Sequence, residues 1–289
     1  MQQEPTLTYN PHPTPPQLKL PAGACDAHVH VFGPAGRFPY AAERHTTPAD
    51  APKEQLFALH KLMGIDRCVV VQSLVHGYDN AAVEDTIEAG GGRYLGVALV
   101  PIDVADAELA RLAAAGFRGV RFHWMGGLNA GASVEQVVTF SRRLAPLGMH
   151  LQLHFSSSEI HAIAGPMAQS AVPVVIDHIA RVDASLGADH ADFRALMQVM
   201  RNPLFHVKVS GVDRIDPNPP YAQGVPLARM LVEQFVDRCF WGSDWPHPNH
   251  THVPDDATLV EQIAKIAPSP ALLQQLMVTN PMNFYRFPA

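Results

Sequence analysis

The chain has 289 residues, 47% of them hydrophobic, and a formal net charge of −6. This length and hydrophobicity allow one large buried core, so we expect a single domain. The acidic balance argues against a nucleic-acid partner, because binding to phosphates requires a stripe of lysines and arginines. No apolar stretch reaches the roughly 18 residues of a membrane-spanning helix, so we expect no membrane association.

The first segment, residues 1–23, is rich in proline, which indicates an extended arm in front of the main domain. It lacks the basic and then apolar pattern of an export signal. The chain has three cysteines, so they cannot all pair, and Cys25, Cys68 and Cys239 each lie in an apolar run. These features predict a cytoplasmic protein with reduced cysteines.

Eight short apolar runs of strand length follow the arm. Segments with helical spacing separate most of them, as at 80–90, 106–116, 133–148 and 191–200. Strands that alternate with helices indicate a parallel sheet, and eight such units over residues 24–289 predict an α/β fold, a single-domain (β/α)8 TIM barrel. An open, doubly wound sheet is the alternative. The eight runs are 25–32, 67–73, 94–100, 119–124, 150–155, 173–178, 204–210 and 239–245.

Polar residues stand at the ends of several of these runs. His28 and His30 are two residues apart, which turns both side chains to one face of the first strand. His154, His178 and Asp244 lie at or near the ends of later runs. Because the active site of such a barrel lies at the carboxyl ends of its strands, we expect these five residues to converge.

Imidazole and carboxylate groups in this number suit a metal ion. Three neutral histidine nitrogens and one carboxylate oxygen are donors that Zn²⁺ or another borderline divalent ion prefers. We therefore expect His28, His30, His154 and Asp244 to bind one divalent ion, with a coordination position left for a hydrolytic water. A single strand-end histidine is more often a hydrogen-bonded core residue, but five coincident placements disfavour that interpretation.

Longer motifs carry a family resemblance. The stretches "DAHVHVFG" (26–33), "VIDH" (175–178) and "WGSDWPHP" (241–248) resemble the amidohydrolase superfamily. Together with "HGYDNAA", "DRID" and "VTNPMNFY", they resemble more narrowly its 2-pyrone-4,6-dicarboxylate lactonase group. The resemblance implies the hydrolysis of lactones of di- and tricarboxylic acids in the catabolism of aromatic compounds.

The resemblance also implies which residues bind the anionic substrate. They are Arg121, Arg181 and Arg214, with His76 as a further candidate. Arginine suits this task because its planar guanidinium binds a carboxylate through two hydrogen bonds.

The chain departs from the lactonase that typifies the group in three places. That enzyme has a tyrosine where this chain has His154, and it works without metal. His154 restores a ligand of the metal-dependent members of the superfamily, although a metal-free reaction with the same residues stays open. Gly126 and Gly127 replace basic residues and Thr46 stands near the position of a tyrosine, so we expect a poor fit for a pyrone dicarboxylate.

The leading hypothesis is lactone hydrolysis with Asp244 as the general base and His178 stabilising the oxyanion. A nonoxidative decarboxylase, a sugar-acid lactone isomerase and a noncatalytic binding module are the alternatives. We expect a small carboxylated lactone as the substrate, and the sequence leaves a homo-oligomer open. The histidines His247, His250 and His252 predict a solvated loop at the mouth of the site.

Overall fold

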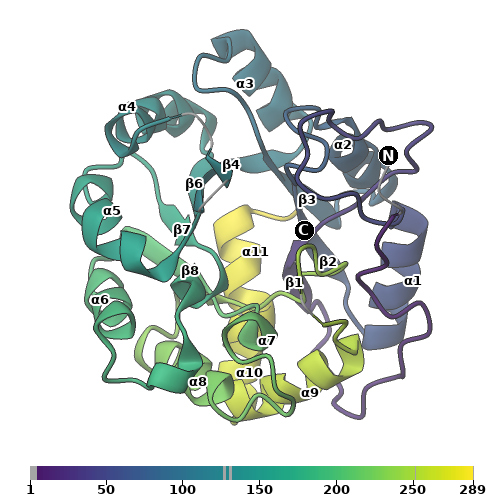
Figure 1. Cartoon of the computed structure of the whole chain (residues 1–289), viewed down its shortest axis with the longest axis vertical. Helices are drawn as coiled ribbons and strands as arrows, with labels where there is room; N and C mark the ends of the chain where they lie inside the picture. The colour runs from purple at the N-terminus through teal and green to yellow at the C-terminus, as the bar shows by residue number, and fades with distance from the viewer. Residues whose placement is uncertain (1–4, 126–127, 130–131, 251, 289) are drawn as a thin grey trace.

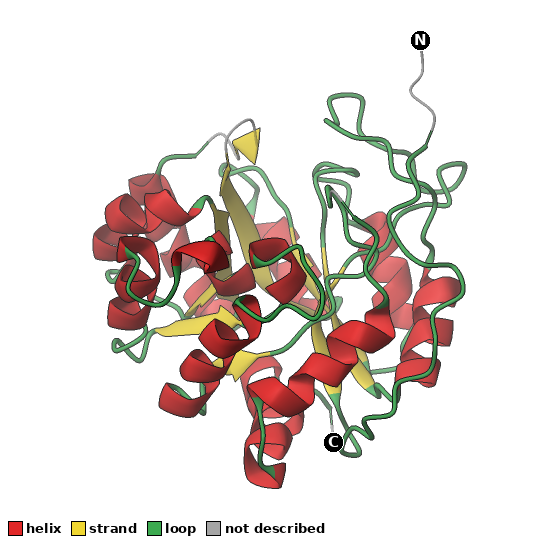
Figure 2. Cartoon of the chain, turned by 60° about the horizontal axis from the view of Figure 1, so that its bottom comes forward, coloured by secondary structure: helices red, strands yellow, loops and turns green. Residues whose placement is uncertain are grey.

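The strands form one sheet that curls into a barrel, with the helices on its outside (Figures 1 and 2). The computed structural model describes residues 5–125, 128–129, 132–250 and 252–288. Eight strands pair in parallel in the order β1-β2-β3-β4-β6-β7-β8-β9, and β5 adds a short antiparallel partner to β4. The strands are β1 Cys25–Val29, β2 Arg67–Val71, β3 Tyr94–Ala98, β4 Phe117–Met125, β5 Leu128–Asn129, β6 His150–Phe155, β7 Val174–Ile176, β8 Phe205–Lys208 and β9 Cys239–Phe240.

The predicted (β/α)8 barrel is confirmed, because each of the eight expected runs overlaps one strand of the parallel sheet. The pairing also rules out the open sheet, since backbone hydrogen bonds of 2.7–2.8 Å join β1 to the segment after β9. These bonds run from Ala27 N to the Trp241 carbonyl, from Asp244 N to the His28 carbonyl and from His30 N to the Trp245 carbonyl.

The helices cover the barrel with their apolar faces. In α4, for example, the Ser133 hydroxyl and the Gln136 side chain form a capping box, and the helix buries Val137, Phe140 and Leu144. The four helical segments expected from spacing are α2, α3, α4 and α6. The helices are α1 Lys53–Met63, α2 Ala81–Ala89, α3 Asp106–Ala114, α4 Val134–Leu144, α5 Ile160–Met167, α6 Ala191–Val199, α7 Val212–Ile215, α8 Gly224–Gln234, α9 Asp256–Ile266, α10 Pro270–Gln274 and α11 Asn280–Tyr285, with short turns η1 Ala145–Leu147, η2 Ser157–Glu159, η3 His178–Arg181, η4 Ala184–Leu186 and η5 Gln275–Thr279.

Apolar residues fill the amino-terminal end of the barrel. Tyr285 of α11 is fully buried and packs there with Cys25, Val69 and Phe240, which come from three different strands. All three cysteines are free and buried, as expected. Because this end is closed by packed side chains, polar chemistry inside the barrel is confined to the carboxyl end of the strands.

The described part of the N-terminal segment lies against the barrel. Thr6 pairs with Pro48, and the Tyr9 hydroxyl donates a 2.6 Å hydrogen bond to Gln55 of α1. The Tyr9 ring also packs against Trp245, at 5.3 Å between ring centroids. We retain 1–23 as the proposed arm and 24–289 as the proposed barrel domain. None of the helices described is long and apolar enough to cross a membrane.

The close packing that closes the barrel predicts that Gly242 does not tolerate a larger side chain. A Cβ on Gly242 would lie 2.7 Å from both the Cβ and the backbone nitrogen of His28. We expect Gly242→Ala to lower the free energy of unfolding by about 2–3 kcal/mol, because overpacking forces β1 and the segment after β9 apart. Urea denaturation followed by circular dichroism measures this change.

Gly165→Ala in α5 is the matched control, since a Cβ there meets no atom within 4 Å. Alanine also favours a helix over glycine by about 1 kcal/mol, so this variant should be as stable as the wild type or more so. Equal destabilisation by the two variants would contradict tight closure at Gly242.

Candidate active site

A cavity that opens to solvent lies at the carboxyl end of the barrel. Its wall combines strand-end residues with residues of the loops that follow the strands. The lining residues are His30, Arg44, His45, Thr46, Ser73, Leu74, Val75, Arg121, His123, His154, His178, Arg214, Asp244, Pro248 and Asn249.

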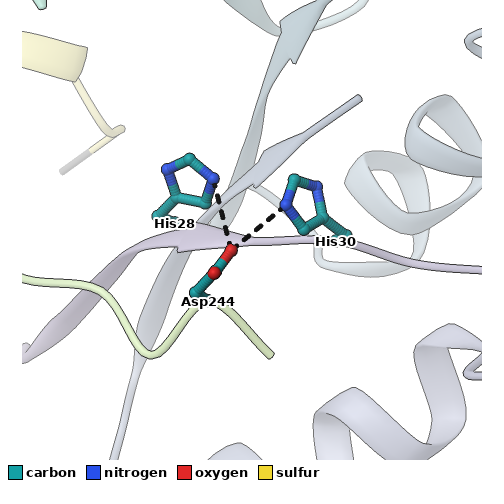
Figure 3. Close-up of side chains that lie close together, drawn as sticks. All are labelled: His28, His30 and Asp244. Carbon is teal, nitrogen blue, oxygen red and sulfur yellow. Dashed lines mark ion pairs between the residues drawn. The ribbon is translucent and has the colours of Figure 1, made fainter. Parts of the chain in front are cut away.

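One buried carboxylate oxygen faces three histidines at the base of this cavity. Asp244 Oδ1 lies 3.2 Å from Nε2 of His30, 3.6 Å from Nε2 of His28 and 3.8 Å from Nε2 of His178 (Figure 3 shows the first two). All four side chains are buried, yet Asp244 Oδ1 accepts no hydrogen bond from the described residues. Four of the five strand-end residues expected to converge, His28, His30, His178 and Asp244, therefore do so here.

The protonation of His30 makes this arrangement suitable for a cation. Its Nδ1 lies 2.7 Å from the Val71 carbonyl, which can only accept, so Nδ1 carries the proton. Burial lowers the pKa of His30, which favours the neutral ring and leaves a lone pair on Nε2. That lone pair faces the lone pairs of Asp244 Oδ1, and a cation between them would turn this repulsion into binding.

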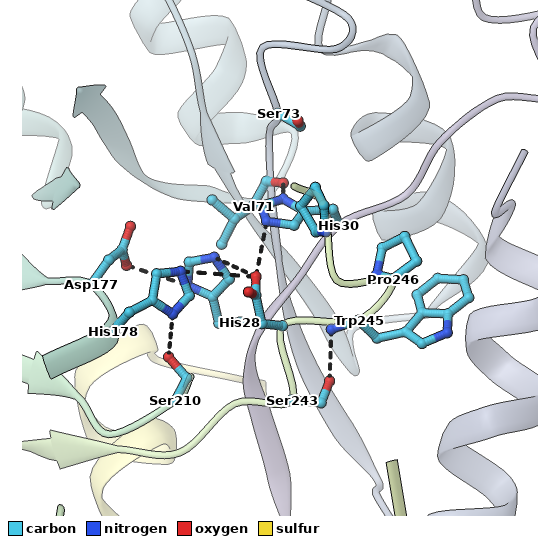
Figure 4. Close-up of polar contacts among 12 residues, drawn as sticks. His28, His30, Val71, Ser73, Asp177, His178, Ser210, Ser243, Trp245 and Pro246 are labelled. Carbon is cyan, nitrogen blue, oxygen red and sulfur yellow. Dashed lines mark hydrogen bonds and ion pairs between the residues drawn. The ribbon is translucent and has the colours of Figure 1, made fainter. Parts of the chain in front are cut away.

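The ligand atoms of His28, His30 and Asp244 all lie within 4.8 Å of one another, so these residues could hold one metal ion. His28 Nε2 has no hydrogen-bond partner among the described residues. Its Nδ1 lies 3.3 Å from Asp177 Oδ1, the contact that commonly orients a metal-binding imidazole (Figure 4). Burial and the nearby Lys208 lower the pKa of His28 to about 3, so its ring is neutral, as a metal ligand must be.

The structure does not place His154 in this group. Its Nδ1 lies 3.2 Å from Nδ1 of His123 on the neighbouring strand, and its ring packs against His178 at 5.5 Å between centroids. His154 Nε2 has no hydrogen-bond partner among the described residues. His154 thus lines the cavity beside the cluster of His28, His30 and Asp244.

The backbone at His178 and Asp244 is unusual for residues other than glycine. His178 has φ 49° and begins a left-handed turn that ends at Arg181 with φ 56°, and Asp244 has φ 64°. Such conformations cost about 1–3 kcal/mol each and concentrate at functional sites. In Figure 4 the His178 ring points toward His28, and its Nδ1 lies 3.0 Å from the Ser210 hydroxyl.

The charge of Asp244 is fixed by its neighbours. Burial raises the pKa of this carboxyl, but Arg214 and His178 outweigh burial and hold the pKa well below its ordinary value. Arg214 contacts Asp244 Oδ2 through Nε and Nη2. Asp244 is therefore ionised at neutral pH, and its Oδ1 lone pairs remain available.

Two of the four predicted anion-binding residues line the cavity. Arg121 and Arg214 do so, whereas Arg181 and His76 are not part of its lining. Burial, followed by repulsion from Arg214, lowers the pKa of Arg181 to about 10. His76 uses both ring nitrogens on the backbone, at 3.0 Å from the Pro39 carbonyl and 3.3 Å from Gly33 N. Thr46 lines the cavity, and Gly126 and Gly127 lie outside the described residues.

The loop after β9 is not solvated as its histidines led us to expect. His247 is fully buried, and its Nε2 lies 3.1 Å from Asp256 Oδ1. The His250 side chain is 1% exposed and that of His252 26% exposed. The His250 and His252 side chains are withdrawn from solvent to these extents because the loop folds back onto α7, where Asp213 contacts both.

Comparison with known proteins places this site in a family. The amidohydrolase family model matches residues 25–287. The chain belongs to the amidohydrolase family. The resemblance seen in the motifs is thereby confirmed.

Among its amidohydrolase relatives, the chain is 42% identical to a 2-pyrone-4,6-dicarboxylate hydrolase of Comamonas testosteroni, over 96% of this chain and 95% of the relative. It is 37% identical to a 4-sulfomuconolactone hydrolase of Hydrogenophaga intermedia, over 95% and 92% of the two chains. A solved structure from Pseudomonas putida, provisionally named a 2-pyrone-4,6-dicarboxylic acid hydrolase, matches with a TM-score of 0.82 at 29% identity, over 93% of this chain and all of that one.

Beneath the histidines, this amidohydrolase buries charges that the sequence interpretation missed. Asp177 Oδ2 accepts a 2.8 Å hydrogen bond from Arg121 Nε, and Asp177 Oδ1 lies 3.8 Å from the fully buried Lys208. Lys208 Nζ also lies 3.2 Å from His28 Nδ1 and donates to Gln152 at 2.8 Å. The available signal was a lysine inside the apolar run 204–210, because a lysine is almost never fully buried unless paired.

These buried charges predict a large loss of stability when the Asp177 carboxylate is replaced by a neutral group. Asp177→Asn leaves Arg121 and Lys208 without their carboxylate partner inside the barrel. We expect the free energy of unfolding, measured by urea denaturation, to fall by about 3–5 kcal/mol.

Glu233→Gln is the matched control, because it removes an exposed ion pair with Arg229 on α8. This variant should lower the free energy of unfolding by less than about 1 kcal/mol. If the two variants lost equal stability, Asp177 would not be the carboxylate that compensates the buried cations.

Proposed function

We propose that this amidohydrolase hydrolyses the ring ester of a small carboxylated lactone from the catabolism of aromatic compounds. The observation that carries the proposal is the ionised Asp244, whose free Oδ1 faces neutral histidines in an arginine-lined cavity. Relatives at 42% and 37% identity are named for the hydrolysis of 2-pyrone-4,6-dicarboxylate and of 4-sulfomuconolactone, which supports the same reaction class.

The donor set fits one divalent ion, and we infer zinc, because two neutral imidazoles and a carboxylate are ligands that zinc prefers. His28, His30 and Asp244 would hold it. His154 is retained as a proposed additional ligand because its Nε2 is buried without a hydrogen-bond partner among the described residues. When bound, such an ion lowers the pKa of a water molecule and polarises a carbonyl group.

Asp244 acts as the general base. Its Oδ1 accepts a proton from the water whose oxygen adds to the lactone carbonyl carbon, and the ring C–O bond then breaks. Asp244 returns this proton to the oxygen that leaves the ring, so the product is a ring-opened acid. The contact with Arg214 keeps Oδ2 occupied, so the transfer falls to Oδ1, which has a second lone pair for the proton when the first would hold an ion.

His178 stabilises the oxyanion that forms when water adds to the carbonyl. The Ser210 hydroxyl, 3.0 Å away, can donate to Nδ1 of His178 and so hold the ring proton on Nε2. Nε2 is then a hydrogen-bond donor at the edge of the cavity, close to the base. A buried donor set in place before the reaction stabilises developing charge more than water does.

Arg121 binds a carboxylate of the substrate. Its Nε is engaged by Asp177, while no described residue accepts a hydrogen bond from its two Nη atoms. These atoms belong to a residue of the cavity wall and can pair with an anion through two hydrogen bonds. Arg214 adds positive charge there, although Asp244 already occupies part of its guanidinium. Arg181 and His76 are not part of the cavity lining, and their role in binding stays a prediction.

The base assignment predicts a severe loss of activity on removing one charge. Asp244→Asn should lower kcat for lactone hydrolysis by about 10²–10⁴-fold, the usual contribution of a general base. Ring opening is followed by titration of the acid produced, with circular dichroism as a check on folding. Asp189→Asn on the exposed surface is the control and should keep the wild-type rate. Turnover near the wild-type rate in Asp244→Asn would refute the assignment.

The same assay separates the alternative reactions. Hydrolysis of a ring ester consumes base because it creates a new carboxylic acid. A decarboxylase would instead release CO₂, and a lactone isomerase would change the substrate with neither signal.

Metal removal gives a further prediction. Dialysis against a chelator should abolish hydrolysis, and one equivalent of Zn²⁺ at this site should restore it. His30→Gln should bind one equivalent less metal than the wild type by elemental analysis, because it loses the Nε2 ligand. His161→Gln on the surface of α5 should retain the full amount. Undiminished activity in metal-free protein would favour the reaction in which the same residues act without an ion.

A further inference from the structure

A second cluster of histidines and carboxylates lies outside the cavity wall. The motif "HPNHTH" after β9 brings His247, His250 and His252 onto Asp213 of α7. Asp213 Oδ2 lies 3.1 Å from Nδ1 of His250 and 3.5 Å from Nε2 of His252. Ligand atoms of Asp213, His247 and His250 all lie within 4.8 Å of one another.

The atoms of this cluster are buried but not hydrogen-bonded. Asp213 is fully buried, and neither of its oxygens has a hydrogen-bond partner among the described residues. Both ring nitrogens of His250 and of His252 are also without one, as is Nδ1 of His247. A buried carboxylate without hydrogen bonds is costly, and a cation placed between these nitrogen and oxygen atoms would compensate that cost.

Two carboxylates outside the cluster, those of Asp256 and Asp244, contact the rings of His247 and His250 and restrict which ring nitrogen carries the proton. His247 Nε2 donates to Asp256 Oδ1 at 3.1 Å, so in the neutral ring the unpartnered Nδ1 carries the lone pair. His250 has a carboxylate near each nitrogen, since its Nε2 lies 3.6 Å from Asp244 Oδ2. A neutral imidazole carries one proton, so one of these two contacts sets lone pair against lone pair unless the ring gains a second proton or a cation is bound.

We propose that Asp213, His247, His250 and His252 bind a second divalent metal ion, of the zinc class, at a structural site. Three imidazole nitrogens and one carboxylate oxygen complete a tetrahedral zinc set, in which Asp256 orients His247 in the manner of an outer-shell carboxylate. The site is separate from the cluster of His28, His30 and Asp244, and it does not depend on the reaction proposed above.

The ion would tie the loop after β9 to α7. That loop supplies Pro248 and Asn249 to the cavity wall, and the Pro248 carbonyl accepts a 2.9 Å hydrogen bond from Arg214. A metal ion at Asp213 therefore fixes the position of this part of the cavity wall relative to Arg214. It stabilises the folded chain because the unfolded chain has no such preformed site.

The test counts metal ions per chain by elemental analysis after incubation with Zn²⁺ and gel filtration. His252→Gln, at the partly exposed edge of the cluster, should hold one equivalent less than the wild type. His161→Gln is the matched control on the surface and should hold the wild-type amount. His250→Gln is a second variant that should also lose one equivalent, with circular dichroism as the check on folding.

Cobalt distinguishes this site from the proposed catalytic one. Loaded with Co²⁺, His30→Gln should retain the visible absorption of a tetrahedral ion, and the double variant His30→Gln/His252→Gln should lose it. If the catalytic residues bind no metal, the wild type holds one ion and His252→Gln none, which still supports the proposal. Equal metal content in the wild type, His252→Gln and His250→Gln would overturn it, and the cluster would then be a network of protonated histidines.

Discussion

The opposition of two lone pairs, on His30 Nε2 and Asp244 Oδ1, is the constraint on which the candidate site depends. The Val71 carbonyl fixes the proton on the far nitrogen of His30, so the near nitrogen cannot donate to the carboxylate. Barrel closure holds the two atoms 3.2 Å apart, because the backbone of Asp244 is hydrogen-bonded to His28, two residues before His30. The fold thus maintains a contact that only a cation or an added proton satisfies.

The charges around this contact set the kind of substrate that the cavity suits. Asp177 and Asp244 are buried carboxylates that face Arg121, Lys208 and Arg214. Within this group of five residues three cations face two carboxylates, and a divalent ion would add to the positive charge. An anionic substrate compensates this charge, whereas a neutral lactone would not.

The sequence predicts those features of the site that follow from local geometry. The spacing of His28 and His30 places both rings on one face of a strand, and the ends of parallel strands bring His178 and Asp244 to the same place. The pairing of Asp177 with Lys208 was missed, since a lysine in an apolar run does not show which carboxylate it will meet. His76 resembled a binding residue, but its ring nitrogens meet the backbone at Pro39 and Gly33. Contacts between a side chain and a distant backbone group produce no repeating pattern in the sequence, so they cannot be predicted from it.

Asp244 also connects the two histidine clusters, because its oxygens serve different neighbours. Oδ1 faces His28, His30 and His178, whereas Oδ2 contacts Arg214 and lies 3.6 Å from His250. Any group that fixes His250 and the Pro248 carbonyl fixes the partners of Oδ2 as well. The orientation of the reactive oxygen is thereby coupled to the loop after β9, although that loop supplies no base. Through His250, the histidine-rich loop therefore contacts the same carboxylate that serves as the base.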